Sequence, residues 1–271
     1  LVIVWNEITA ILLKKSLKTK FKNRYIVNIR DYGYNDRLFL KDLTKIIIKN
    51  SAFVMLSSDK FKDFLPKSEK YVFVHSYNNS LLSNFHFKYK KNEEKTIQIL
   101  FIGKMSYIEN SKKIILKFAN DSRFSLKFVG AGSEGLRSFL LENNIKNVLL
   151  SGSFLPIETV NYLREADIIF NLYGYGKKDV DTALSIKLYY SIHMAMPILV
   201  YNNTHMNYYA KKAGVNITID FDKQDEICND VYQKFNEWDS DIARKSCEIV
   251  LKEIHKSQDI LFKKIDELLE R

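Results

Sequence analysis

Proline, glycine and cysteine are scarce in this chain. Only 3 Pro, 9 Gly and 2 Cys occur among 271 residues, which excludes collagen-like and low-complexity architectures. Cys228 and Cys247 both lie on helical patterns late in the chain, so neither a disulfide framework nor a clustered zinc site is expected. We predict two free thiols in a reducing compartment. The apolar content of 46% is enough for substantial hydrophobic cores.

Long hydrophobic runs are also missing. No apolar stretch reaches the roughly 18 residues that a membrane-spanning helix needs. The chain opens on Leu1 rather than Met, and Leu1 to Trp5 lacks the basic flank and the length of a signal peptide. We therefore expect no spanning helix, and we expect the sequence to begin inside a domain.

Acidic residues are outnumbered: 42 Lys and Arg face 32 Asp and Glu, a formal net charge of +10. This balance favours anionic partners such as sugar nucleotides, lipid diphosphates, acidic membranes or nucleic acid, without choosing among them. Nucleic acid is supported by charge alone, because no aromatic and basic recognition motif accompanies it.

The densest basic cluster lies near the start of the chain and contains no acid. Apolar residues at helical spacing accompany it, so the segment predicts an amphipathic helix lying on an anionic membrane surface. A solvated, lysine-rich face of an ordinary core helix is the alternative. The residues expected at a membrane surface are Lys14, Lys15, Lys18 and Lys22.

Short apolar runs alternate with helical periods along the whole chain, the pattern of an α/β protein. Strands are expected at 1–4, 25–29, 53–56 and 71–74, with helices at about 7–20, 36–49 and 59–65. The polar segment 78–95 predicts an interdomain connection. Further strands are expected near Ile99, Leu126, Val148, Ile168, Ile198 and Ile217, and a long helix at 239–271.

Between Ile97 and Val200 the buried-strand patterns end repeatedly in glycine or polar turns. Such runs are typical of a parallel sheet covered on both faces. Ligands bind such sheets at the carboxyl ends of the strands, where glycine lets backbone N–H groups approach a phosphate. The segment therefore predicts a nucleotide site.

The order of these turns resembles the C-terminal domain of GT-B glycosyltransferases, especially the bacterial family-4 (group 1) enzymes that build cell-surface polysaccharides. The resemblance rests on Ile-Gly-Lys at 102–104, Phe-Val-Gly-Ala-Gly-Ser-Glu at 128–134, the strand and turn at 147–154, Ala-Asp-Ile-Ile at 166–169, and the helix and strand at 185–200. Asn-Ile-Arg-Asp-Tyr at 28–32 resembles a strand end of the family's N-terminal domain.

The resemblance implies a GT-B fold, in which two Rossmann-like domains with parallel sheets face a cleft. Residues 1–85 are expected to form a partial, truncated acceptor-side domain and 86–238 the nucleotide-sugar domain. Residues 239–271 are expected to form a helix that packs back toward the first domain.

The same resemblance implies a set of donor-binding residues. Lys104 and Lys112 are the phosphate candidates, although ordinary surface lysine is the alternative for both. Glu134 is expected to bind ribose or to cap a helix, and Phe154 to lie near the base or in the core. The full set is Gly103, Lys104, Lys112, Gly130, Gly132, Glu134, Ser153, Phe154, Asn171, Tyr173, Ser185, Lys187 and Tyr190.

Two positions depart from the family. Retaining members carry two glutamates separated by seven residues, and Thr182 and Tyr190 stand at those positions. Lys187 can compensate at the donor phosphates, and Asp179 or Asp181 can replace the first glutamate.

For acceptor activation, Asp31 at a strand end is the preferred general base, with a loop-fixing Asp as the alternative. His75 is the weaker candidate, because a lone histidine at a strand end is more often structural. His193 and His205 lack metal-ligand spacing, so no protein-built metal site is expected.

We therefore expect a metal-independent glycosyltransferase that moves a sugar from a UDP- or GDP-sugar to a lipid-linked or polysaccharide acceptor in bacterial surface glycan synthesis. No tightly bound cofactor is implied. The expected location is the cytoplasm, either free or peripheral on the inner face of the cytoplasmic membrane. A degenerate nucleotide-sugar-binding or scaffold protein and a GT-B sugar-nucleotide epimerase are the alternatives.

Overall fold

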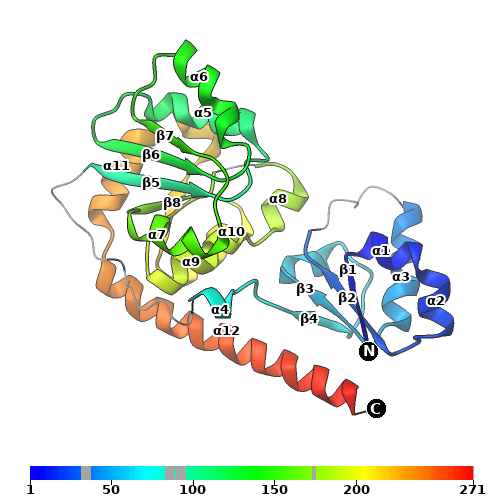
Figure 1. Ribbon diagram of the computed structural model, residues 1–271. Coiled ribbons are helices and arrows are strands. Elements are labelled where there is room, and N and C mark those ends of the chain that lie inside the picture. Colours follow the sequence, from blue (N-terminus) through cyan, green and yellow to red (C-terminus); the bar gives the residue numbers. More distant parts are fainter. Residues whose placement is uncertain (32–37, 83–88, 90–95, 173–174, 271) are drawn as a thin grey trace. The chain divides into compact units, whose positions relative to one another are not determined.

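The structure is a computed structural model of the 271-residue chain, and it describes residues 1–31, 38–82, 89, 96–172 and 175–270. The chain divides into two compact α/β units (Figure 1). The first unit comprises Leu1–Ser76, Lys178–Leu184 and Lys252–Arg271, and the second comprises Tyr77–Lys177 and Ser185–Leu251.

The first unit is built on a four-stranded parallel sheet with the order β1-β2-β3-β4. Its strands are β1 (Val2–Trp5), β2 (Tyr25–Ile29), β3 (Phe53–Leu56) and β4 (Tyr71–Phe73). Its helical segments are α1 (Glu7–Leu12), α2 (Lys14–Thr19), α3 (Leu38–Asn50), the 3-10 helix η1 (Asp59–Asp63), α8 (Lys178–Thr182) and the later part of α12 (Ser240–Leu269). The strand predictions are confirmed to within one residue at each end.

The predicted helix at 7–20 is divided into α1 and α2. The break lies at Leu13, whose backbone has φ −89° and ψ 6° while its N–H still donates to the carbonyl of Thr9 at 3.1 Å. The apolar period runs through this break, because Ile11 and Leu17 are both buried. Hydrophobic spacing alone therefore could not reveal it.

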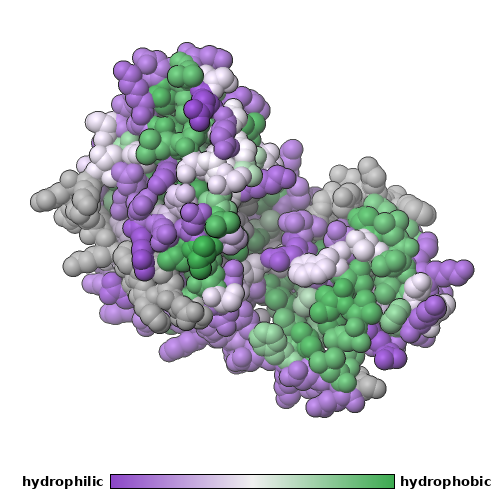
Figure 2. Space-filling view, in the orientation of Figure 1, coloured by the Kyte–Doolittle hydropathy of each residue, from purple (hydrophilic) through white to green (hydrophobic). Residues whose placement is uncertain are grey.

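The two faces of the first sheet are covered to different extents. On one face Val27 and Val54 pack with helices α1 and α3 in one apolar cluster. On the other face Ile26 of β2 packs with Leu261 of α12. The alternate side chains of the edge strand β1 stay uncovered there: Leu1, Ile3 and Trp5 are 42%, 44% and 58% exposed. Figure 2 shows extensive hydrophobic surface on this unit.

The second unit contains a six-stranded parallel sheet with the order β10-β9-β8-β5-β6-β7. The strands are β5 (Ile97–Ile102), β6 (Phe124–Val129), β7 (Val148–Ser151), β8 (Ile168–Phe170), β9 (Ile198–Tyr201) and β10 (Asn216–Ile219). The helical segments are α4 (Asn79–Leu82), α5 (Ile108–Phe118), η2 (Ser133–Leu136), α6 (Arg137–Glu142), η3 (Pro156–Glu158), α7 (Thr159–Arg164), α9 (Ile186–Met194), α10 (His205–Lys212), η4 (Phe221–Glu226) and α11 (Ile227–Glu237).

All six strands expected for this unit are present, and the long C-terminal helix is α12. The helix begins where the side chain of Asp239 accepts hydrogen bonds from the N–H groups of Asp241 and Ile242, at 2.8 and 2.9 Å. An aspartate in this position satisfies N–H groups that have no partner within the helix. Two parallel α/β units agree with the fold class expected from the sequence.

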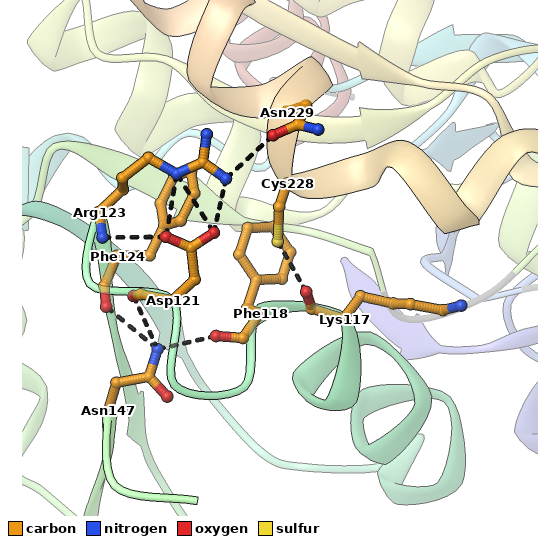
Figure 3. Close-up of polar contacts among 8 residues, drawn as sticks. All are labelled: Lys117, Phe118, Asp121, Arg123, Phe124, Asn147, Cys228 and Asn229. Carbon is orange, nitrogen blue, oxygen red and sulfur yellow. Dashed lines mark hydrogen bonds and ion pairs between the residues drawn. The ribbon is translucent and has the colours of Figure 1, made fainter.

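A polar network fixes the turn before β6 to helix α11 (Figure 3). The guanidinium of Arg123 donates to both carboxylate oxygens of Asp121, at 2.9 and 2.6 Å, and to Asn229 Oδ1 at 3.0 Å. Cys228 Sγ donates to the carbonyl of Lys117 at 2.7 Å. Both cysteines are free, as predicted. The network lies at the amino end of β6 and therefore leaves the carboxyl ends of the strands available for a site.

Candidate functional site

The candidate site lies at the carboxyl ends of the strands of the second unit. There β5 has β6 on one side and β8 on the other, so the strand order reverses at β5. Such a switch point separates the loops that leave neighbouring strands, and ligands of open parallel sheets bind there. The switch point gives a location for the predicted nucleotide site.

Two glycine turns contact each other at this point. Gly103 follows β5 with φ 127°, and Gly130 follows β6 with φ 132°. A Cβ atom on Gly130 would lie 2.0 Å from the carbonyl oxygen of Gly103. Glycine is therefore required at 130 both by its backbone angle and by the closeness of the neighbouring turn.

The predicted residues after β6 and β7 come together. Gly132 has φ 90° and opens the 3-10 helix η2. The carboxyl group of Glu134 lies against Gly152, where an added Cβ would be 1.7 Å from Oε1. Ser153 is exposed, and the half-buried ring of Phe154 packs edge-on against Tyr162 with centroids 5.6 Å apart. Glu134 and Ser153 thus follow adjacent strands at one edge of the sheet.

Lys187 is a buried cation above an aromatic floor, which we define as Phe101, Phe128 and Phe170 of β5, β6 and β8. The three ring centroids lie 5.6 to 6.1 Å apart. Lys187 is 8% exposed, and its Nζ lies 4.9 Å from the ring centroid of Phe101. Burial lowers the pKa of Lys187 to about 8, because an ammonium group away from water is disfavoured. A bound anion would restore the preference for the charged form.

Helix α9 positions this lysine. Ser185 precedes the helix, and its Oγ accepts a hydrogen bond from the N–H of Lys187 at 3.3 Å. Tyr190, one turn further along, is buried, and burial raises its pKa. Ser185, Lys187 and Tyr190 thus lie in α9 or at its start, the element for which the resemblance predicts donor-binding residues.

Several buried polar atoms near the same strand ends have no hydrogen-bond partner among the residues that the structure describes. Asn171 follows β8 and is 6% exposed, and its Oδ1 is one of them. The others are Ser111 Oγ in α5, Ser133 Oγ in η2 and Asn202 Oδ1 after β9. Buried polar atoms are normally paired, so this group points to a ligand with several polar atoms. Sequence reasoning found Asn171 but missed the other three, since single Ser and Asn residues carry no distinguishing pattern.

The remaining predicted donor residues differ in their surroundings. Lys104 is exposed and forms no ion pair with another described residue. Lys112 is half-buried, donates to Glu109 at 2.8 Å and lies 5.7 Å from the ring centroid of Phe139. Tyr173 lies outside the described residues. Lys104 is thus the one of the two lysines whose charge is unpaired.

The two positions that depart from the family's pattern, Thr182 and Tyr190, belong to different units. Thr182 is the last residue of α8, and its carbonyl accepts a hydrogen bond from Ser58 Oγ at 2.5 Å within the first unit. Asp179 and Asp181 lie in the first turns of the same helix. Tyr190 lies in α9 of the second unit, and this helix contains no Asp or Glu residue.

Polar residues also gather at the carboxyl ends of the strands of the first unit. Arg30 and Asp31 follow β2, and Ser57, after β3, donates to the carbonyl of Arg30 at 2.6 Å. The Arg30 guanidinium donates to Ser76 Oγ at 3.0 Å, and His75 before it is buried. Glu7, which sequence reasoning treated only as the start of a helix, also lies at this edge. We call this set the first-unit rim.

The basic segment of the first unit is exposed. The side chains of Lys14, Lys15, Lys18 and Lys22 are all open to solvent, and Leu12 beside them is 80% exposed. None of the helices in the described ranges is both long and apolar enough to cross a membrane. In those ranges, no three His, Cys, Asp or Glu side chains form a group that could hold a metal ion.

Sequence comparison finds no matching protein family and no matching curated protein. Solved structures do match. A sucrose-phosphate synthase from Thermosynechococcus elongatus matches with a TM-score of 0.74 at 10% identity, covering 98% of this chain and 74% of its own. Anabaena HepE in complex with UDP gives 0.70 at 9% identity, covering 98% and 78%. A glycosyltransferase from Rickettsia africae gives 0.70 at 14% identity, covering 100% and 78%. The fold of this chain is the GT-B fold.

Proposed function

We propose that this chain is a glycosyltransferase that uses a nucleotide sugar, with the second unit as the donor-binding domain. The observation that carries the proposal is Lys187, a buried ammonium above the aromatic floor at the switch point of the sheet. Burial disfavours the charge of an ammonium group, and an anion such as a diphosphate beside it offsets that cost. The same group leaves with negative charge when the sugar is transferred, so Lys187 would also stabilise the transition state.

The surroundings of Lys187 fit a nucleoside diphosphate. The Gly103 and Gly130 turns leave room for phosphate oxygens near backbone N–H groups, and Lys104 offers a second charge. The unpaired oxygens of Asn171 and Ser133 are suited to hydroxyl groups of a sugar or ribose. Two lysines are able to neutralise the diphosphate, so transfer is proposed to need no divalent metal. UDP is the first nucleotide to test, because HepE was solved with UDP and with UDP-glucose.

The acceptor is proposed to be a polysaccharide or a lipid-linked glycan that binds on the first unit. Asp31 of the first-unit rim is the proposed general base, since it is an exposed carboxylate at a strand end. Lys14, Lys15, Lys18 and Lys22 are proposed to hold the protein on the anionic, cytoplasmic face of a membrane. Neighbours in fold include WaaG, described as a glycosyltransferase involved in lipopolysaccharide biosynthesis, with a TM-score of 0.59. A surface glycan is therefore the favoured product.

Calorimetric titration with UDP, GDP, CMP and ADP tests the donor proposal. We expect saturable binding of one nucleotide by the full chain, and loss of that binding in Lys187→Met but not in Lys113→Met. Lys113 is an exposed lysine of α5, so Lys113→Met removes the same charge as Lys187→Met but from the surface. Absence of binding by all four nucleotides would reject the proposal. Unchanged binding after chelation of divalent ions would support the metal-independent form.

Thr182 and Tyr190 favour a second candidate, a nucleotide-sugar-binding protein without transfer activity. Neither side chain can supply the carboxylate expected from the resemblance, and Tyr190 is buried in α9. The two candidates differ in turnover rather than in binding. Release of UDP from UDP-glucose, with and without cell-envelope lipid extract, separates them: binding with no release supports the second candidate.

A further inference from the structure

Two neighbouring residues at the end of β1 depart from ordinary protein structure. Asn6 has φ 62° and ψ 160°, a backbone region that residues other than glycine rarely adopt. Glu7 is 2% exposed, and neither of its carboxyl oxygens has a hydrogen-bond partner among the described residues. Strained backbone and unpaired buried polar groups both concentrate at functional sites.

A structural role does not account for Glu7. The start of α1 is capped by Asn6, whose Oδ1 accepts a hydrogen bond from the N–H of Thr9 at 2.9 Å. The carboxyl group of Glu7 is therefore not the cap of α1. Its own backbone N–H favours the charged form without meeting the geometry of a hydrogen bond. A methionine would fill the same space without a buried polar group. A glutamate in the first turn of a helix is favoured by the helix dipole, but an exposed carboxylate gains the same contribution, so this does not explain why Glu7 is buried.

The charge of Glu7 is also disfavoured. Burial raises the pKa of its carboxyl group above the ordinary 4.5, and the negative charge of Asp31 raises it further. The guanidinium of Arg30 donates to Ser76 and lies 5.9 Å from the ring centroid of Trp5. Glu7 thus holds its proton to a higher pH than an exposed glutamate does.

The position of Glu7 in the sheet is what suggests a ligand. β1 and β2 are parallel neighbours, and Trp5 pairs with Asn28, so Glu7 and Asp31 both follow strand ends at the first-unit rim. The carboxyl group of Asp31 is exposed, whereas that of Glu7 is buried and its pKa is raised, which favours its neutral form. A neutral carboxyl group donates one hydrogen bond and accepts others, which matches the needs of a sugar hydroxyl group.

We propose that Glu7 binds the acceptor, and that its carboxyl group forms hydrogen bonds with a hydroxyl group of an acceptor sugar. This inference rests on the proposed function for its setting, namely that the first unit receives the acceptor. Because the oxygens of Glu7 are covered in the ligand-free chain, the side chain must turn toward the rim when the sugar binds. The carboxyl group of Glu7 lacks hydrogen-bond partners in its buried position, so gaining them from the sugar favours binding.

The test uses the full chain with 13C-labelled glutamate, and the Glu7 carboxyl signal is assigned by its loss in Glu7→Gln. The probes are methyl glycosides of glucose, galactose, mannose and N-acetylglucosamine at high millimolar concentration. At least one glycoside is expected to shift the Glu7 signal in a saturable manner. The affinity is read from the NMR signals of the glycoside itself, so that variants lacking the Glu7 carboxyl group can be compared. It should fall roughly tenfold in Glu7→Ala, the equivalent of one hydrogen bond to a neutral group, and should be largely kept in Glu7→Gln, whose amide also donates and accepts. Glu69→Gln, which changes an exposed carboxyl group of the same unit, should leave the affinity unchanged.

Stability gives a second, independent measurement. Glu7→Met should raise the thermal midpoint by about 2–4 °C while abolishing the sugar response, because it removes an unpaired buried group. A lower midpoint in Glu7→Met would show a structural role, and no response to any glycoside would show that Glu7 binds no sugar. Either result overturns the inference. Titration of the same samples with UDP reports on the second unit separately, so loss of UDP binding rejects the proposed function and not the role of Glu7.

Discussion

The turn at Gly130 lies directly against the carbonyl oxygen of Gly103, so close that a Cβ atom at 130 would be 2.0 Å from that oxygen. A Cβ atom at Gly103 would meet no heavy atom within 4 Å, although both residues have positive φ. Substitutions at the two glycines therefore distinguish the cost of a strained backbone, which both share, from the cost of a steric clash, which arises only at Gly130.

Alanine substitution at the two glycines should differ in effect. Gly103→Ala is expected to destabilise the chain by about 1–3 kcal/mol through its backbone angle alone. Gly130→Ala adds a clash with backbone atoms, and overpacking of this kind costs a further ~1–3 kcal/mol. Urea unfolding of the two variants measures the difference. Equal losses of stability would show that the turns separate easily, contrary to the structure.

The buried ammonium of Lys187 makes stability depend on pH. Its pKa is about 8 in the folded chain and 10.5 in an exposed lysine. Between these values the unfolded chain binds more protons, so the free energy of unfolding should rise with pH from about 8 toward 10.5. Lys187→Met should remove this rise and stabilise the chain at neutral pH by about 1–3 kcal/mol.

The affinity for UDP should fall as the pH rises, whereas the stability of the chain should increase. UDP binding needs the charged form of Lys187, so the affinity measured by calorimetry should fall as the pH rises through 8. Lys113→Met is the control, because Lys113 is an exposed lysine of α5 outside the proposed donor set. A variant Lys187→Met that is less stable at neutral pH, or that still binds UDP tightly, would contradict the proposed role.

The sequence predicts the parallel strands well because their signals are local. Runs such as Ile99–Ile102 and Ile168–Phe170 are continuous and apolar, and each ends in a polar or glycine turn. The break at Leu13 is not visible in this way, since a turn of nearly helical geometry keeps the apolar spacing. Strand order at the switch point also escapes the sequence, because it depends on pairing between strands that are distant in the chain.

Among the residues of the proposed donor site, the sequence singles out only those that a motif carries. Gly130 and Lys187 belong to ordered turns, whereas Ser111 and Asn202 become noticeable only when burial shows that their oxygens lack partners. Glu7 was missed for a related reason. A glutamate at the start of a helix is common on local grounds, and only its 2% exposure distinguishes it.

Lys104 should contribute to binding without contributing to stability. It is exposed and unpaired among the described residues, so Lys104→Met should change the free energy of unfolding by no more than about 0.5 kcal/mol. UDP affinity should fall roughly tenfold, the effect of removing one charge-assisted hydrogen bond. Lys113→Met on the next helix is the matched control. Equal affinity of the two variants would place the diphosphate away from Lys104.

Membrane attachment by the basic segment of the first unit should depend on both charge and an apolar anchor. Changing Lys14, Lys15, Lys18 and Lys22 to Gln should release the protein from vesicles of anionic lipid, at about 1 kcal/mol per charge near the surface. Leu12 is 80% exposed beside these lysines, and Leu12→Ser should weaken sedimentation with the same vesicles roughly tenfold. Leu141→Ser, which changes a 76% exposed leucine of α6 in the second unit, should leave it unchanged. If the two leucine variants sediment alike, Leu12 does not enter the lipid and the basic face is simply solvated.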